Sequence, residues 1–330
     1  MDVPETDFER FHLVCDVCRL EDVFMKPPKL KKGGNIRIIA PASAPSLRSL
    51  TIGVSKLIEL GYRVTLGDNI RKTKQIGYLS ASDQDRANEL NDAFADDSVD
   101  AVFCARGGYG SLRILPLIDF DVIKDHPKIF VGYSDITALH LAIGKKTDLI
   151  TFHGPMPGVD FEQKIPKTID EMFKLLRGET LDLTPQISRI LGTVVEGETS
   201  GISAGTNFSL VTSLFGTEFQ LIPNRRILFL EDVATSILDI DRYMAELLLS
   251  KTLYQLKGMV FGDFVEIPHE DWPVPSLKEV IYNYVNKMKK PIIYGMPFGH
   301  GEDQMTIPLN AEIRISTEDS NIVLLEDVVD

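Results

Sequence analysis

The sequence predicts an α/β protein of two domains, the first built on a doubly wound parallel sheet and the second a mixed α/β domain richer in β-structure. Strand-like and helix-like runs alternate from residue 35 onwards, which is typical of βαβ units. The strand-like runs are continuously apolar, as expected when helices cover both faces of a sheet. Near residues 178–200 the helical period stops, and β-branched residues and turns take over. We therefore expect an N-terminal extension (1–34), a first domain (35–178), a linker (179–200) and a second domain (201–330).

The first domain follows the stretch KPPKLKKGG, whose Pro-Pro and Gly-Gly pairs indicate a linker. A helix is predicted over 46–61 by apolar residues at helical spacing, with Gly61 as its end. A helix over 80–96 opens with serines and carries acids in its first turn, which suits the positive end of a helix dipole. A third helix is expected over 135–146. Strands expected to form a flavodoxin-like sheet lie at 35–43, 62–67, 99–108, 128–134 and 149–155.

The second domain contains the same two kinds of pattern. Helical spacing occupies 236–256 and 276–290, and the last two apolar runs, 311–316 and 321–327, read as a closing antiparallel hairpin. Further strands are expected at 225–233, 258–267 and 291–301.

Composition excludes several classes of protein. The chain has 330 residues, of which 44% are apolar and 25% charged, a normal balance for a globular protein. Its formal net charge of −13 argues against a nucleic-acid partner, because such affinity depends on neutralising phosphates with Lys and Arg. No apolar run is long enough for a transmembrane helix, and the acidic N-terminus lacks the features of a secretory signal. We therefore expect a cytoplasmic protein with no membrane partner.

The three cysteines suggest neither disulfides nor a metal site. Cys15 and Cys18 form a single CxxC with His12 nearby, and Cys104 lies far along the chain. A structural zinc site needs four ligands, and no second CxxC is present. An odd and sparse set of cysteines is also not a disulfide framework. For Cys15 and Cys18, ordinary cysteines in an N-terminal extension are the favoured interpretation.

Candidate functional residues stand at the carboxyl ends of the predicted strands, where open α/β sheets bind ligands. The loop RGGYGS lacks the glycine spacing of a dinucleotide or P-loop site, which argues against a dehydrogenase. We interpret it as a glycine turn whose backbone N–H groups line a site. The candidates are the loop 106–111, Ser134-Asp135, His153, Glu231-Asp232 and His300.

Ser134 has two interpretations. It is placed to cap the helix that follows, a role that serine prefers, and from this segment alone the cap is favoured. It is also placed as a nucleophile, because GYSDI is similar to the G-x-S-x-G elbow with isoleucine replacing the last glycine. Such a serine needs a base and a group that orients the base. Position alone leaves open the choice between His153 and His300, and that between Glu231 and Asp232.

Five segments together carry a resemblance. In chain order they are ARGGYGSLRILPLID, PKIFVGYSDITALHLAI, TFHGPM, LFLEDV and YGMPFGHG. In this order and spacing the chain resembles the LD-carboxypeptidase family of serine peptidases, which also includes the microcin C immunity peptidases. The resemblance extends from about residue 35 to residue 327 and is closer to the murein LD-carboxypeptidase branch.

The resemblance implies a Ser-His-Glu triad and selects between the open alternatives. Ser134 would be the nucleophile, Glu231 the orienting acid and His300 the base. The backbone N–H groups of Asp135 and Gly108 would form the oxyanion hole. The family resemblance also implies a homodimer and no metal or organic cofactor. Candidate contacts to substrate are Arg106, Tyr109 and Asn207, the last in Gly-Thr-Asn-Phe where the family often has Gly-Gly-Asn-Leu.

The implied reaction is hydrolysis of the amide between the L-centre of a diamino acid and a terminal D-amino acid. In the family this releases D-alanine from a murein tetrapeptide during peptidoglycan recycling. One alternative is a microcin-immunity-like peptidase acting on peptidyl-nucleotides, with Tyr109 or Trp272 stacking on the base. Another is a non-catalytic peptide-binding protein of the same fold, against which the retained triad residues argue.

Overall fold

The computed structural model describes residues 24–70, 75–162, 166–180, 182–183, 192–286, 288–318 and 321–330. The predictions for His12, Cys15 and Cys18 lie outside the described residues. No helix of the described residues is long and apolar enough to cross a membrane.

The first sheet has the predicted parallel, doubly wound topology. Its strand order is β11-β5-β4-β3-β1-β2, and its first five strands in chain order show the flavodoxin-like order 2-1-3-4-5. All neighbours among these five are parallel, whereas β11 is antiparallel to β5. The strands are β1 (Asn35–Ile39), β2 (Arg63–Leu66), β3 (Ala101–Cys104), β4 (Ile129–Gly132), β5 (Thr151–His153) and β11 (Ile307–Leu309).

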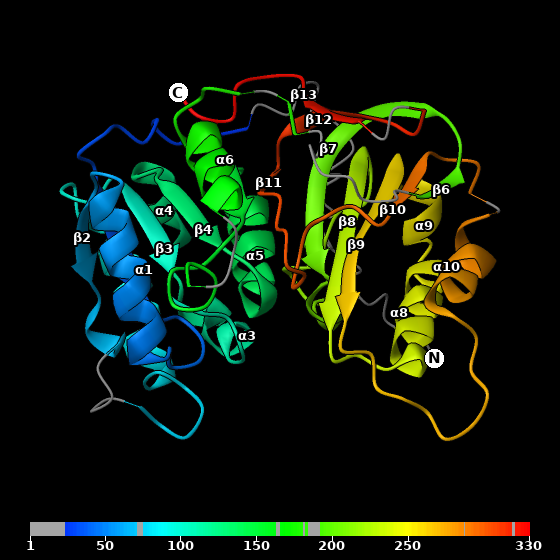
Figure 1. Ribbon diagram of the computed structural model, residues 1–330, viewed down its shortest axis with the longest axis horizontal. Coiled ribbons are helices and arrows are strands. Elements are labelled where there is room, and N and C mark those ends of the chain that lie inside the picture. The colour runs from blue at the N-terminus through cyan, green and yellow to red at the C-terminus, as the bar shows by residue number, and fades with distance from the viewer. Residues whose placement is uncertain are drawn as a thin grey trace, which may run out of the picture.

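Helices cover this sheet, and the longer ones begin where the sequence places a cap. Ser46 and Ser82 accept hydrogen bonds from the backbone N–H groups of Ser49 and Asp85, so each satisfies a donor of its first helical turn. In Figure 1, α1 and α6 lie in front of the sheet. The helices are α1 (Leu47–Glu59), α2 (Asp83–Ala95), α3 (Ser111–Ile114), α4 (Phe120–Asp125), α5 (Thr137–Thr147) and α6 (Pro166–Leu176).

The second sheet is mixed, as predicted. Its order is β13-β12-β7-β8-β9-β10-β6. Strands β7 to β10 are mutually parallel, and antiparallel strands flank them on both sides. The expected closing hairpin is β12 with β13. The strands are β6 (Gly192–Val195), β7 (Glu198–Asn207), β8 (Arg226–Val233), β9 (Gly258–Val265), β10 (Ile292–Tyr294), β12 (Glu312–Ser316) and β13 (Asn321–Leu324).

The helix predicted over 236–256 is two helices. Lys251 adopts a left-handed conformation with φ of 62°, which a continuous right-handed helix does not tolerate. The chain therefore turns between α8 and α9 (Figure 1). The helices of this half are α7 (Phe208–Ser213), α8 (Ile237–Leu249), α9 (Thr252–Gln255) and α10 (Leu277–Val285).

Two parts of the chain differ from the sequence-based expectation. Strand β6 and the start of β7 fall inside the stretch predicted as a linker. Strand β11 comes from the second half of the chain but pairs with β5 of the first sheet, with Ile307 opposite His153. The chain thus returns to the first sheet before it forms β12, and the two halves are joined through β-structure.

The hydrophobic cores are also continuous between the halves. Alternate residues of β1, β3 and β4 contribute to two core clusters, as the two faces of a strand require, and each cluster contains residues of both sheets. Phe24 and Leu30, from the stretch predicted as an extension, are buried in the second of these clusters. The described part of that stretch therefore packs against the body of the protein.

Candidate functional site

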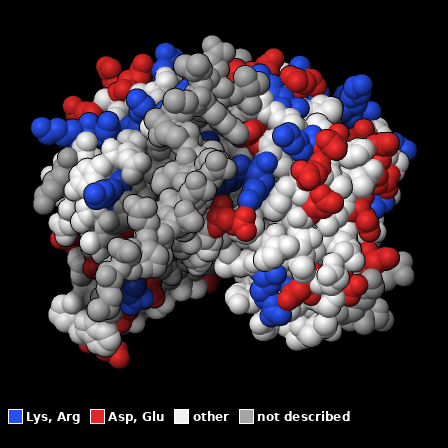
Figure 2. Space-filling model, turned by 180° about the vertical axis from the view of Figure 1, so that it is seen from behind, with Lys and Arg blue, Asp and Glu red and all other residues white. Residues whose placement is uncertain are grey.

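The carboxyl ends of the strands in the two halves meet at one place. Glu231 lies near the end of β8, His300 follows β10, and Tyr133 follows β4. His300 Nδ1 lies 2.7 Å from Glu231 Oε2, and the ring of Tyr133 lies 5.0 Å from that of His300 between centroids. The mutually parallel strands of both sheets run toward the lower edge of Figure 1, and the surface seen from behind is notched there between the halves (Figure 2).

Ser134 is not a helix cap, so the interpretation that its own segment favours is wrong. It opens a short 3₁₀ turn, Ser134–Ile136, and α5 begins beyond it without a side-chain cap. Its φ of 64° is left-handed, a conformation that costs a non-glycine residue free energy and that concentrates at functional sites. No described residue forms a hydrogen bond with its hydroxyl. The serine is therefore held by its backbone, with its side chain left available.

Glu231, which is buried, and His300, which is partly buried, form a hydrogen-bonded pair. Burial raises the pKa of Glu231, and attraction to His300 opposes that rise. Burial alone would lower the pKa of His300, but the charge and hydrogen bond of Glu231 outweigh it, so the pKa of His300 lies above its ordinary value of 6.5. Gly299 allows this approach, because a Cβ at that position would lie 2.6 Å from Glu231 Oε2.

The two remaining candidates, His153 and Asp232, form hydrogen bonds with other residues than Glu231 and His300. His153 is fully buried, its Nδ1 lies 2.5 Å from Thr206 Oγ1, and burial holds its pKa well below the ordinary value. Asp232 accepts hydrogen bonds from Asn207 Nδ2 and from the backbone N–H groups of Ser209 and Val233. Only Glu231 and His300 therefore pair with each other.

The glycine loop lies against the turn that carries Ser134. A Cβ built on Gly107 would lie 2.9 Å from Ser134 Cβ and 3.2 Å from the backbone N of Asp135, so the close approach requires glycine. Gly108 follows with φ of 98°, and its N–H donates to no described residue. The peptide that joins these two glycines thus lies beside Asp135 N–H, as two donors to one oxyanion would have to lie.

The three residues expected to contact substrate have different surroundings. Arg106 is exposed. Burial raises the pKa of the Tyr133 phenol well above its ordinary value, and the charge of Arg106 opposes that rise, so Arg106 lies near the site. Tyr109 is 52% exposed and packs edge-on against Tyr78 with centroids 5.3 Å apart. Asn207 is buried and caps α7, accepting from Leu210 N–H. Its side chain is occupied within the protein and does not face solvent.

Two residues beside the pair were not expected from the sequence. Tyr133 OH donates to Asp160 Oδ1 at 3.0 Å, while the other oxygen of Asp160 accepts from Met156 N–H at 2.8 Å. Asp160 is buried and contributes to the raised pKa of His300. The position of Tyr133 before Ser134 was visible in the sequence, but nothing in the segment around Asp160 marks it.

Comparison with known proteins identifies the family of this chain. Residues 36–154 match the LD-carboxypeptidase N-terminal domain, and residues 200–315 match the LD-carboxypeptidase C-terminal domain. The chain belongs to the LD-carboxypeptidase family. The family membership predicted from the five motifs is thereby confirmed. The family is one of peptidases, which are hydrolases.

Individual members of the LD-carboxypeptidase family align over nearly the whole chain. A Bacillus subtilis protein named as a probable murein peptide carboxypeptidase is 36% identical over 302 residues, covering 91% of this chain and 94% of that protein. The microcin C7 self-immunity protein MccF of Escherichia coli is 27% identical over 319 residues, covering 87% of this chain and 91% of its own. The crystal structure of an MccF-like protein from Bacillus anthracis has a TM-score of 0.82 at 30% identity, covering 91% of this chain and 99% of that one.

Proposed function

We propose that this protein is a serine LD-carboxypeptidase that removes a terminal D-amino acid from a murein peptide. The observation that supports it best is the partly buried 2.7 Å pair of Glu231 and His300, formed next to the turn of Ser134. A serine hydroxyl is a poor nucleophile until a base accepts its proton, and the base needs a third group to hold its tautomer. These three residues supply those parts.

In the proposed reaction, Ser134 attacks the carbonyl carbon of the terminal amide while His300 Nε2 accepts the proton of its hydroxyl. Glu231 accepts the hydrogen bond from Nδ1–H and stabilises the imidazolium that forms. The oxyanion receives hydrogen bonds from the N–H groups of Asp135 and Gly108. His300 then protonates the departing amine, and an acyl-enzyme on Ser134 remains for hydrolysis by water.

The substrate assignment rests on two points. The B. subtilis relative, named as a probable murein peptide carboxypeptidase, is 36% identical over 91% of this chain. A terminal carboxylate also needs a cation, and exposed Arg106 at the entry to the glycine loop can supply one.

The test is mass spectrometry of a murein tetrapeptide incubated with the wild type and with Ser134→Ala. The wild type is expected to release one alanine and the variant none, while both bind the peptide. If Ser134→Ala cleaves as fast as the wild type, Ser134 is not the nucleophile. Binding without cleavage by the wild type would instead favour a peptide-binding protein.

A second candidate is a peptidase of microcin-like peptidyl-nucleotides. The aromatic pair of Tyr78 and Tyr109, both more than half exposed beside the glycine loop, favours it because such a surface can stack on a base. Turnover of a murein tetrapeptide and of a peptidyl-adenylate, compared in the wild type and in Tyr109→Ala, separates the two. The second candidate predicts that Tyr109→Ala impairs only the adenylate.

A further inference from the structure

A buried arginine lies behind the glycine loop and takes no part in the proposed chemistry. Arg86, in the second turn of α2, has no exposed surface. Burying a guanidinium is costly unless its hydrogen bonds and charge are matched. Its partners are therefore informative about why it is there.

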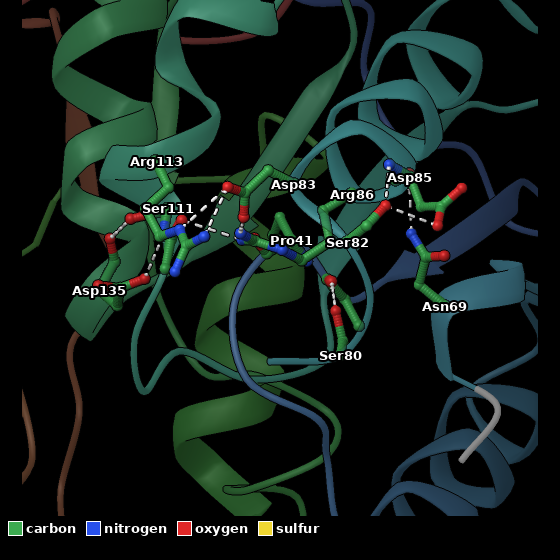
Figure 3. Close-up of polar contacts among 12 residues, drawn as sticks. Pro41, Asn69, Ser80, Ser82, Asp83, Asp85, Arg86, Ser111, Arg113 and Asp135 are labelled. Carbon is green, nitrogen blue, oxygen red and sulfur yellow. Dashed lines mark hydrogen bonds and ion pairs between the residues drawn. The ribbon is translucent and has the colours of Figure 1, made fainter. Parts of the chain in front are cut away.

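Arg86 joins the two loops that border the expected binding edge of the first sheet. Its Nη1 donates to Pro41 O, in the loop after β1, and to Gly110 O at 2.9 Å, in the loop after β3. In a sheet of order 2-1-3-4-5, ligands bind where β1 and β3 part in opposite directions. Figure 3 shows Arg86 beside Pro41 and Asp83. The side chain of Arg86 thus links the two loops at that point.

The charge of Arg86 is balanced on its other side. Nη2 donates to Asp83 Oδ1 at 2.5 Å, and the second oxygen of Asp83 receives Nε and Nη2 of Arg113 at 3.0 and 2.8 Å. Arg113 is 45% exposed. Asp83 therefore pairs with one buried and one exposed arginine side chain, and of these two side chains only that of Arg86 forms hydrogen bonds with the two loops in the described structure.

The far side of the glycine loop is tied to the turn of Ser134. The carboxylate of Asp135 accepts from the backbone N–H of Ser111 at 2.8 Å, and Ser111 Oγ donates to the backbone O of Asp135. Asp135 is buried. Closer to β1, Ser43 N–H donates to Gly107 O, and Ser43 Oγ accepts from Tyr109 N–H, each at 3.1 Å. The loop from Gly107 to Ser111 is thus held at both ends.

The space around Gly110 shows how closely this loop is fitted. Its φ of 122° is open to glycine only, and a Cβ there would lie 2.6 Å from Leu79 Cδ2 and 3.0 Å from Arg86 Nη1. The carbonyl of Gly110 accepts from Arg86 Nη1 at 2.9 Å and from the backbone N–H of Arg113 at 3.2 Å, so Arg86 is the side chain that helps to hold it in place. Loss of the bond from Arg86 would leave Gly110 O with the backbone N–H of Arg113 as its remaining donor among the described residues and would loosen the loop that leads back to Gly108.

We infer that Arg86, with the carboxylate and backbone of Asp135, forms a clamp that sets the distance between the glycine loop and Ser134. Arg86 is a positioning residue that touches no substrate, and it acts through the N–H of Gly108. The inference rests on the proposed serine chemistry and adds to it the group that aligns the oxyanion donors. Preorganised donors act only when they are fixed where negative charge develops.

The test compares Arg86→Lys with the matched control Arg113→Lys. Lysine keeps the charge but lacks the planar fork that reaches two carbonyl oxygens and a carboxylate together. Two rates are measured: D-alanine release from the tetrapeptide, and labelling of Ser134 by a fluorophosphonate, whose attack also develops an oxyanion. Arg86→Lys is expected to lower kcat and the labelling rate by about 10- to 100-fold, somewhat less than deletion of an oxyanion donor. KM and tetrapeptide binding stay within about threefold.

Arg113→Lys should leave both rates within about twofold, because exposed ion pairs contribute little. An unchanged labelling rate in folded Arg86→Lys would overturn the inference, as would an equal loss in Arg113→Lys. If Arg86→Lys does not fold, Ser111→Ala removes only the hydroxyl on Asp135 O and should still lower the labelling rate severalfold without changing KM; no change overturns the inference. If the wild type is labelled on Ser134 but releases no D-alanine, the substrate is wrong while the labelling rates still decide on the clamp.

Discussion

Glu231→Gln tests the proposed mechanism most directly, because it keeps the shape of the side chain and removes its charge. Glu231 Oε2 lies 2.7 Å from His300 Nδ1, so charge centres roughly 4 Å apart attract by about 4 kcal/mol at an effective dielectric constant of about 20. That attraction is available only when His300 is protonated, which is the state reached in the transition state. Its loss corresponds to about a thousandfold in kcat.

The pH dependence of the same variant has a definite sign. In the wild type, Glu231 is the main group that raises the pKa of His300 above 6.5, against the effect of burial. Because His300 must be neutral to act as a base, kcat/KM should rise with pH through that raised pKa. In Glu231→Gln the opposing burial remains, so the acid limb should move to lower pH even as the maximum rate falls.

The assay is D-alanine release from a murein tetrapeptide, measured between pH 5 and pH 9 as kcat/KM. The control is Glu312→Gln, a half-exposed glutamate of β12, which should leave both rate and profile unchanged. The role given to Glu231 and His300 would be refuted by a Glu231→Gln variant whose kcat lies within tenfold of the wild-type value. It would also be refuted if the acid limb of the pH profile moved to higher pH.

Two further predictions concern residues near Ser134 and in the core of the first domain. Gly107→Ala places a methyl group 2.9 Å from Ser134 Cβ and should lower the rate of fluorophosphonate labelling at least about tenfold. In the control Gly192→Ala the new methyl group meets only Tyr294, at 3.9 Å. Equal labelling rates in the two variants would contradict the predicted effect of the Gly107 contact. His140 is buried and burial lowers its pKa from 6.5 to about 4, so its contribution to stability is present above about pH 6.5 and is lost as pH falls toward 4. From this group we expect the free energy of unfolding to be about 3 kcal/mol lower at pH 4 than at pH 6.5. Urea unfolding should therefore show a weaker pH dependence of stability in His140→Gln than in the wild type. An identical pH dependence in the two proteins would exclude a lowered pKa of His140.

Much of the fold could be predicted because it depends on local pattern. The serine caps of α1 and α2, the buried strands β3 and β4, and the hairpin of β12 and β13 are where the sequence indicates them. Caps and periodicity act within a few residues, so they are visible without knowledge of the partner strand. Strand β11 was not visible in this way, because three residues have too little pattern and its partner β5 lies about 150 residues earlier.

The residues of the site were likewise predictable in part from local pattern and in part only from the tertiary structure. Periodicity placed Ser134, His153, Glu231 and His300 at strand ends, and the family resemblance selected among them. The tertiary structure then paired Glu231 with His300 and enclosed His153 beside Thr206. It also removed the cap interpretation of Ser134, because that depends on where the first turn of α5 begins.

The sequence by itself determined the alternation of elements, the positions of the strand ends and the residue types available there. Only the tertiary structure decided which strand ends meet, that Asn207 is occupied as a cap, and that Arg86 lies buried between the loops after β1 and β3. The physical reason is that strand order and sheet-to-sheet packing join residues far apart in the chain. Arg86 in particular looks like any arginine on the polar face of a helix until the carbonyl oxygens of Pro41 and Gly110 are brought to it.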